Sequence, residues 1–242
     1  MNCLPLPDPL PLGEREAVRL WWVRPEAFHE TPEVLSLLSL EERAQQLRFI
    51  PPGKRHEFLV ARVLARRVLG EALRIDPASV RFTNNEWGRP ELSPACGLRF
   101  NITHTDGLVA LLISDQHEVG VDTELFSRAP RILALGPNVF APKELTDLSA
   151  LPSEQQAHRA VTLWTLKESY IKARGMGLAL ALDGFSFRFE ESRIRLEVEP
   201  ALNDDGELWQ FQTITHGPHL ISTAIRNPST MPAKLELIEA TI

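Results

Sequence analysis

The hydrophobic positions of this chain follow two periods, that of helices and that of strands. Two long stretches, 54–74 and 154–174, carry apolar residues at helical spacing, and shorter helical patterns lie at about 32–48 and 138–149. The strand patterns are short and are bounded by turn residues. They lie at 17–23, 80–83, 98–103, 108–114, 118–124, 185–189, 194–198, 209–215 and 220–225.

These elements repeat in order along the chain. A strand, a short helix, a long helix and further strands occur once before and once after a join near 115–118. Runs of strands linked by hairpins, such as the one that Asp106 and Gly107 predict, are typical of α+β proteins with antiparallel sheets. We therefore predict an α+β fold, a pseudo-twofold monomer of two similar lobes, 1–116 and 117–242. Each lobe is expected to be a small, mainly antiparallel sheet packed with a long helix, with the functional site in the cleft between the lobes.

Composition narrows the class of protein. The chain has 242 residues, of which 43% are hydrophobic, so it can bury a full core. No apolar run approaches the roughly 18 residues that a transmembrane helix needs, and a formal net charge of −6 argues against a general binder of nucleic acid or acidic membranes. Two cysteines are too few for a disulfide framework or a zinc site. Residues 1–13 are rich in proline and lack a basic start, which predicts an extended arm in a cytoplasmic protein.

Two carboxylates stand on one predicted strand. Asp122 and Glu124 alternate with Val121 and Thr123, so both project from the same face. Residues two apart on a strand are about 6 to 7 Å apart, and carboxylates at that separation repel each other unless a cation lies between them. Hard oxygen ligands of this kind suit Mg²⁺ or Mn²⁺. The alternative is a polar strand face that contacts only water.

The second long helix contains the sequence WTLKESYIKARG, residues 164–175. Its Glu168 and Lys172 are four residues apart and lie one turn above each other. Taken alone, they form an exposed ion pair worth roughly 0.3 to 0.5 kcal/mol. Only the presence of the other motifs in the sequence favours a functional role for these two residues.

Three further features are candidates for ligand contacts. Thr103 and His104 stand where the strand 98–103 ends, and a histidine in that place is either a satisfied structural residue or a ligand contact. The loop 87–90 contains Arg89, which can meet an anion. Arg55 and Arg62 are seven residues apart and share a face of the first long helix, although solvated helix charge is the default for such a cluster.

The order of these motifs is more specific than any one of them. The series G-R-P, F-N-x-T-H, G-x-D-x-E and W-x-x-K-E-x-x-x-K runs between Trp87 and Leu178. It resembles the Sfp-type family of 4′-phosphopantetheinyl transferases, which move phosphopantetheine from coenzyme A to a serine of a carrier protein. Where that family usually has serine before the histidine, this chain has Thr103, which keeps the hydroxyl. The resemblance implies two similar α+β lobes, with coenzyme A and Mg²⁺ in an active site between them.

The resemblance also implies roles for individual residues. The implied metal ligands are Asp122, Glu124 and Glu168. The implied catalytic residues are Glu168, Lys172, Glu144 and Lys167. The implied contacts of coenzyme A are Arg55, Arg62, Arg89, Pro90, Thr103, His104, Asp122 and Lys172. Among these, Arg55 and Arg62 would hold the 3′-phosphate.

The implied reaction is Mg²⁺-dependent transfer to a serine hydroxyl of an apo acyl or peptidyl carrier protein, with release of 3′,5′-ADP. The cation would bridge the pyrophosphate oxygens, and Lys172 would stabilise the leaving phosphate. Glu168, Glu144 or a metal-bound water would take the serine proton, and the sequence does not choose among them. Two alternatives stay open, a divalent-metal phosphohydrolase or nuclease and a non-catalytic protein that binds coenzyme A or the carrier. The sequence does not indicate whether the carrier serves fatty acid, polyketide or peptide synthesis.

Overall fold

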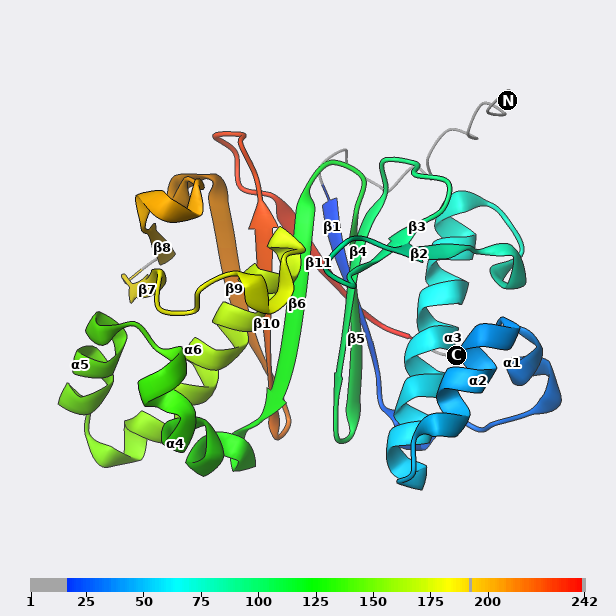
Figure 1. Cartoon of the computed structure of the whole chain (residues 1–242), viewed down its shortest axis with the longest axis horizontal. Helices are drawn as coiled ribbons and strands as arrows, with labels where there is room; N and C mark the ends of the chain where they lie inside the picture. The colour runs from blue at the N-terminus through cyan, green and yellow to red at the C-terminus, as the bar shows by residue number, and fades with distance from the viewer. Residues whose placement is uncertain (1–16, 192, 241–242) are drawn as a thin grey trace.

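Two sheets stand beside each other in the middle of the molecule, with helices on their outer flanks (Figure 1). The structure is a computed structural model that describes residues 17–191 and 193–240, so the arm predicted at 1–13 lies outside the described residues. One sheet has the strand order β11-β1-β5-β4, and the other has the order β6-β10-β9. Their strands are β1 (Ala17–Val23), β4 (Arg99–Thr105), β5 (Leu108–Ser114), β6 (Glu118–Leu125), β9 (Trp209–His216), β10 (His219–Arg226) and β11 (Lys234–Glu239). Two small hairpins complete the strands, β2 (Phe82–Asn84) with β3 (Pro90–Leu92) and β7 (Phe185–Phe189) with β8 (Ile194–Val198).

The helices include two long ones and four shorter ones in the described part of the chain. They are α1 (Pro32–Ser36), α2 (Leu40–Arg48), α3 (Pro52–Leu73), α4 (Ala129–Val139), α5 (Pro142–Ala150) and α6 (Ser153–Arg174). The pattern predicted at 138–149 corresponds to α5, and α4 before it was not predicted; the pattern predicted at 32–48 forms two helices, α1 and α2. The pattern at 32–48 breaks because Ser39 caps α2, exchanging hydrogen bonds with Glu42 in a capping box. Helix α3 begins at Pro52, two residues before the predicted stretch 54–74, since a proline in the first turn needs no backbone donor.

The two halves have the same topology. In each sheet, the first strand of the half pairs antiparallel with the last strand of a hairpin, so that β1-β5-β4 matches β6-β10-β9. The long helices α3 and α6, both of 22 residues, cover the outer faces of the two sheets, and each half adds one small hairpin. These correspondences confirm the predicted α+β fold with its internal repeat.

The last strand departs from the prediction. Strand β11 pairs in parallel with β1, from Ala17 opposite Lys234 to Trp22 opposite Glu239. The predicted C-terminal lobe, 117–242, therefore contributes its final strand to the sheet of the N-terminal half. Neither β11 nor the three-residue β3 was expected, because charged residues interrupt the first and the second is too short to show a period.

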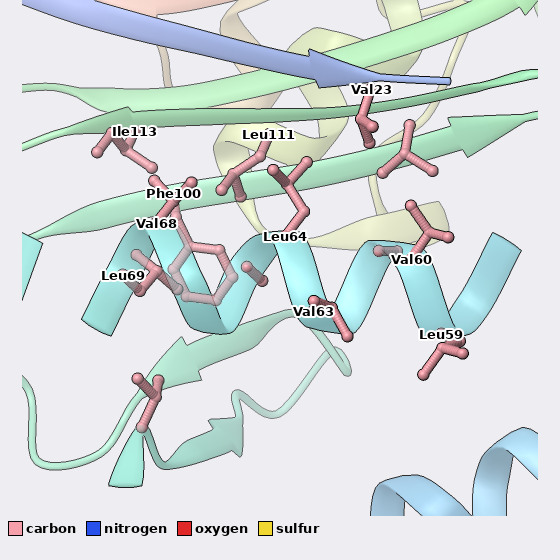
Figure 2. Packing of buried hydrophobic residues seen from close by; sticks show 14 of the residues in the cluster. Val23, Leu59, Val60, Val63, Leu64, Val68, Leu69, Phe100, Leu111 and Ile113 are labelled. Atoms are coloured by element: carbon pink, nitrogen blue, oxygen red, sulfur yellow. The ribbon is translucent and has the colours of Figure 1, made fainter. Parts of the chain in front are cut away.

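The described residues form three apolar cores, one within each half and one between the two sheets. One lies between α3 and its sheet, where Leu64 and Val68 pack near Leu111 and Phe100 (Figure 2). A second surrounds α6 in the other half. The third lies between the two sheets and contains Leu20, Leu112, Val121 and Ile221, among others. None of the helices in the described ranges is long and apolar enough to cross a membrane.

Candidate active site

The carboxylates of β6 face helix α6. Val121 points the other way into the core between the sheets, so Asp122 and Glu124 share the face that the sequence predicts. Helix α6 crosses this face closely, because Gly120 has no side chain: a Cβ there would lie 2.0 Å from the carbonyl oxygen of Ser169. Asp122 is buried, and Glu124 is half-buried. The strand therefore holds two carboxylates beneath a helix.

Helix α6 contributes Lys172 to the same place. Its Nζ lies 2.5 Å from Oδ1 of Asp122 and donates to Oγ1 of Thr103 at 3.1 Å. Lys172 therefore does not form the solvated surface pair with Glu168 that the spacing of these two residues alone would suggest. Glu168 lies close enough to Asp122 and Lys172 for their charges to act on it.

The hydroxyls of β4 hold the carboxylates of β6. Thr103 donates to Oδ1 of Asp122 at 3.1 Å, and Thr105 donates to Oε1 of Glu124 at 2.9 Å. Asn101, two residues earlier on the same face of β4, accepts the backbone N–H of Val121 at 2.8 Å. The sequence identified Thr103 but missed the other two, although their alternation with Thr103 is a signal that could have found them.

Burial and mutual repulsion act on the carboxylates. Burial raises the pKa of Asp122, and the Glu124 carboxylate adds to this, while Lys172 and the Thr103 hydroxyl oppose it. Burial also raises the pKa of Glu168, and the charge of Asp122 raises it further. A bound cation would therefore stabilise the ionised form of these carboxylates.

The oxygen donors of these side chains fit Mg²⁺ or Mn²⁺ in chemical kind. No cluster of three or more acidic, histidine or cysteine side chains in the described ranges is already arranged to hold a metal. The positive charge that contacts Asp122 is the ammonium of Lys172.

His104 lies on the other face of β4, toward α3. Its side chain is 38% exposed, and its Nδ1 lies 3.3 Å from Oε2 of Glu57 on α3. Burial lowers the pKa of His104, and the Glu57 carboxylate counteracts part of that effect. The sequence predicted His104 as a ligand contact but gave no indication of Glu57, which is distant in the chain.

The loop before β3 lines a cavity of about 270 Å³ beside Lys172. Trp87, Arg89 and Pro90 form one wall, and Glu168 with Lys172 forms another. The guanidinium of Arg89 donates to the carbonyl of Ala173 at 2.8 Å, and burial lowers its pKa. Arg89 therefore ties the loop to α6, a contact that the sequence did not anticipate.

The structure does not bring the two α3 arginines together with His104. Arg55 donates to the carbonyl of Phe49 at 3.1 Å. Arg62 lies 3.7 Å from Glu42 and over the rings of Phe58 and Phe82, beside a separate cavity of about 330 Å³. Their role toward a 3′-phosphate stays a prediction.

Lys167 and Glu144 are also separate from the other predicted catalytic residues. Their charged groups lie 2.8 Å apart, and each side chain is 1% exposed. Lys167 also donates to the carbonyls of Leu182 and Phe185, both at 2.7 Å. This buried ion pair ties α6 to α5 and to the segment around β7, so its contacts are those of a structural pair.

Comparison with known proteins gives the family. A model described as the 4′-phosphopantetheinyl transferase superfamily matches residues 118–224, and one described as the N-terminal part of 4′-phosphopantetheinyl transferases matches residues 21–116. The 4′-phosphopantetheinyl transferase ffp of Bacillus subtilis is 34% identical over 176 residues, which are 72% of this chain and 77% of that protein. HetI, a 4′-phosphopantetheinyl transferase of a Nostoc species, is 32% identical over 215 residues, or 86% of each chain. The chain belongs to the 4′-phosphopantetheinyl transferase family and is an enzyme of that class.

A more distant likeness exists among solved structures. A holo-(acyl-carrier-protein) synthase from Bacillus anthracis, solved in complex with CoA, is 14% identical with a TM-score of 0.40. The match covers 46% of this chain and 96% of that one. The family assignment rests on the sequence relatives.

Proposed function

We propose that this enzyme transfers 4′-phosphopantetheine from coenzyme A to a serine hydroxyl of an apo acyl or peptidyl carrier protein, needs Mg²⁺, and releases 3′,5′-ADP. The observation that carries the proposal is the meeting of Asp122, Lys172 and Thr103 within hydrogen-bond distance, next to the cavity that Glu168 lines. Membership of the family gives the group that is transferred.

Asp122, Glu124 and Glu168 would hold the cation, which would offset charge on the pyrophosphate oxygens when bound. Thr103 and Thr105 keep the β6 carboxylates oriented, since each donates a hydrogen bond to one of them. This orientation is fixed before any ligand binds, which lowers the cost of reorganisation during the reaction.

Lys172 would act on the leaving phosphate. Its ammonium is half-buried and held by Asp122, so it presents a fixed positive charge beside the cavity. Of the two glutamates considered as the base, Glu144 is enclosed with Lys167. Of the two glutamates, Glu168, which lines the cavity and has a raised pKa, would therefore be the one to accept the serine proton, with a metal-bound water as the alternative base.

The test is incubation of the enzyme with an apo carrier protein, coenzyme A and Mg²⁺, followed by intact mass of the carrier and measurement of 3′,5′-ADP. We expect one phosphopantetheine group per carrier, an equal amount of 3′,5′-ADP, and no reaction in excess EDTA. Breakdown of coenzyme A without carrier would favour the phosphohydrolase alternative. Binding of coenzyme A without any product would favour the non-catalytic one. A monomeric state and a cytoplasmic location stay predictions.

A further inference from the structure

Glu57 on α3 is a buried acid that reaches the end of β4. Its side chain is 8% exposed, and Oε2 lies 3.3 Å from Nδ1 of His104. Burying a carboxylate is costly unless it is paired and hydrogen-bonded, so a glutamate in this place needs a reason. Its partners are the histidine on one side and Lys54 on the other.

Lys54 connects this pair to the neighbouring turn. Its Nζ donates to both carboxylate oxygens of Glu57, at 3.2 and 2.9 Å, and also contacts Oδ1 of Asp106 at 2.5 Å. Asp106 in turn accepts from Arg128 at 3.0 Å. The network fixes the Glu57 carboxylate from both sides, which leaves it little freedom to move away from His104.

The charges around His104 come from two helices. Burial lowers the pKa of the imidazole, and the ammonium groups of Lys54 on α3 and Lys172 on α6 lower it further. Glu57 is the acidic group that acts in the opposite direction, through its charge and through the hydrogen bond to Nδ1. Without that carboxylate, His104 would be neutral over a wider range of pH.

We propose that Glu57 is a positioning residue for His104: it accepts the Nδ1–H, fixes the plane of the ring, and favours the cationic form of the imidazole, in which Nε2–H can donate to a phosphate oxygen of coenzyme A. This inference rests on the proposed function, since it takes coenzyme A as the ligand. A carboxylate that orients a histidine through one ring nitrogen leaves the other nitrogen for the ligand.

The first experiment reads the pair without any ligand. The imidazole of His104 is titrated by NMR in the wild type and in Glu57→Gln, which keeps the shape of the side chain but removes its charge. We expect the titration midpoint to fall in Glu57→Gln and to recover in part in Glu57→Asp. The control is Glu71→Gln, which should leave the midpoint unchanged. Glu71 is an exposed acid near the end of the same helix.

The second experiment is a double-mutant cycle on binding of coenzyme A, measured by calorimetry at a pH just below the wild-type midpoint. Glu57→Gln should raise Kd about tenfold when His104 is present, because a charge-assisted hydrogen bond is replaced by a weaker one. In the His104→Ala background the same change should alter Kd by less than about twofold, since the partner is gone. Melting temperatures identify any variant that fails to fold.

Two results would overturn the inference: an unchanged His104 midpoint in Glu57→Gln, or an equal loss of coenzyme A affinity with and without His104. If the wild type does not bind coenzyme A at all, the proposed function fails and the phosphate contact fails with it. The NMR titration still decides in that case whether Glu57 controls the charge of His104.

Discussion

Strands β6 and β1 occupy the same place in the two halves but carry different chemistry. Strand β1 pairs with β5, the second strand of the hairpin that closes at Thr105–Leu108. Strand β6 pairs with β10, the second strand of the hairpin that closes at His216–His219. Counted from those closing pairs, Glu124 opposite Leu220 corresponds to Val23 opposite Val109. By the same count Asp122 corresponds to Trp21.

On β1 this face packs into the core beneath α3, where Val23 is 4% exposed. On β6 the same face carries carboxylates, held by two threonines and Lys172. The backbone geometry of a strand beneath a long helix is therefore compatible with either a packed core or a polar site. What creates the site is the choice of side chains on one strand face, together with neighbours that compensate the buried charge.

The largest effect on stability is expected at the buried ion pair of the C-terminal half. Lys167→Met leaves Glu144 buried without its partner, so the free energy of unfolding should fall by about 3–5 kcal/mol. Lys143→Met, which breaks the exposed pair with Glu197, should cost about 1 kcal/mol or less. Denaturant unfolding measures both. A loss of kcat of on the order of 10² in folded Lys167→Met, with stability unchanged, would instead support the catalytic role that the family resemblance implies.

The next largest effect is expected on kcat, from substitutions of two residues of α6. Glu168→Gln and Lys172→Met should each lower kcat by on the order of 10², or about 3 kcal/mol of barrier, at saturating coenzyme A and carrier. Glu71→Gln, at the same position in α3 as Lys172 in α6, is the control and should leave kcat unchanged.

The stability of Glu168→Gln has a sign that follows from its pKa. Burial and Asp122 raise the pKa of Glu168, so the fold disfavours its ionised form, and this cost is present above the raised pKa. Replacing the acid by a neutral amide should therefore stabilise the metal-free protein at neutral pH and have little effect in acid. A melting temperature that falls at pH 7 would contradict this account.

A smaller effect concerns the approach of helix to strand. In Gly120→Ala the new methyl group meets the backbone of Ser169, so α6 must shift and the free energy of unfolding should fall by about 2 kcal/mol. Gly53→Ala, in the first turn of α3, meets nothing within 4 Å and should be neutral or stabilising by up to about 1 kcal/mol. Equal melting temperatures for the two variants would show that the close packing on β6 has no energetic weight.

The smallest effect is expected at Thr103. Thr103→Ser keeps the hydroxyl that links Lys172 and Asp122, so kcat should stay within about twofold of the wild type. Thr103→Val removes the hydroxyl at nearly constant volume and should lower kcat by about tenfold. If the serine variant were as impaired as the valine variant, the hydroxyl alone would not explain the role of Thr103, and its methyl group would be equally important.

The sequence predicted what depends on local pattern. The alternation on β6 placed Asp122 and Glu124 on one face, and the repeated order of elements predicted the two matching halves. It could not predict contacts that form between distant segments, such as Glu57 with His104 or β11 with β1, because no local period encodes them. Lys167 shows that neighbours in the sequence need not share a site. It is next to Glu168, but one residue along a helix turns the side chain by about 100°, which places Lys167 away from the cavity.

The central claim is that the carboxylate face of β6, and not its counterpart on β1, carries the reaction. The most direct measurement is kcat for Asp122→Asn and for Trp21→Phe at saturating coenzyme A, carrier and Mg²⁺, with melting temperatures as the check on folding. We expect Asp122→Asn to lose kcat by on the order of 10³ or more while it stays folded, and Trp21→Phe to keep it within about twofold. An Asp122→Asn enzyme with kcat within about tenfold of the wild type would contradict the claim.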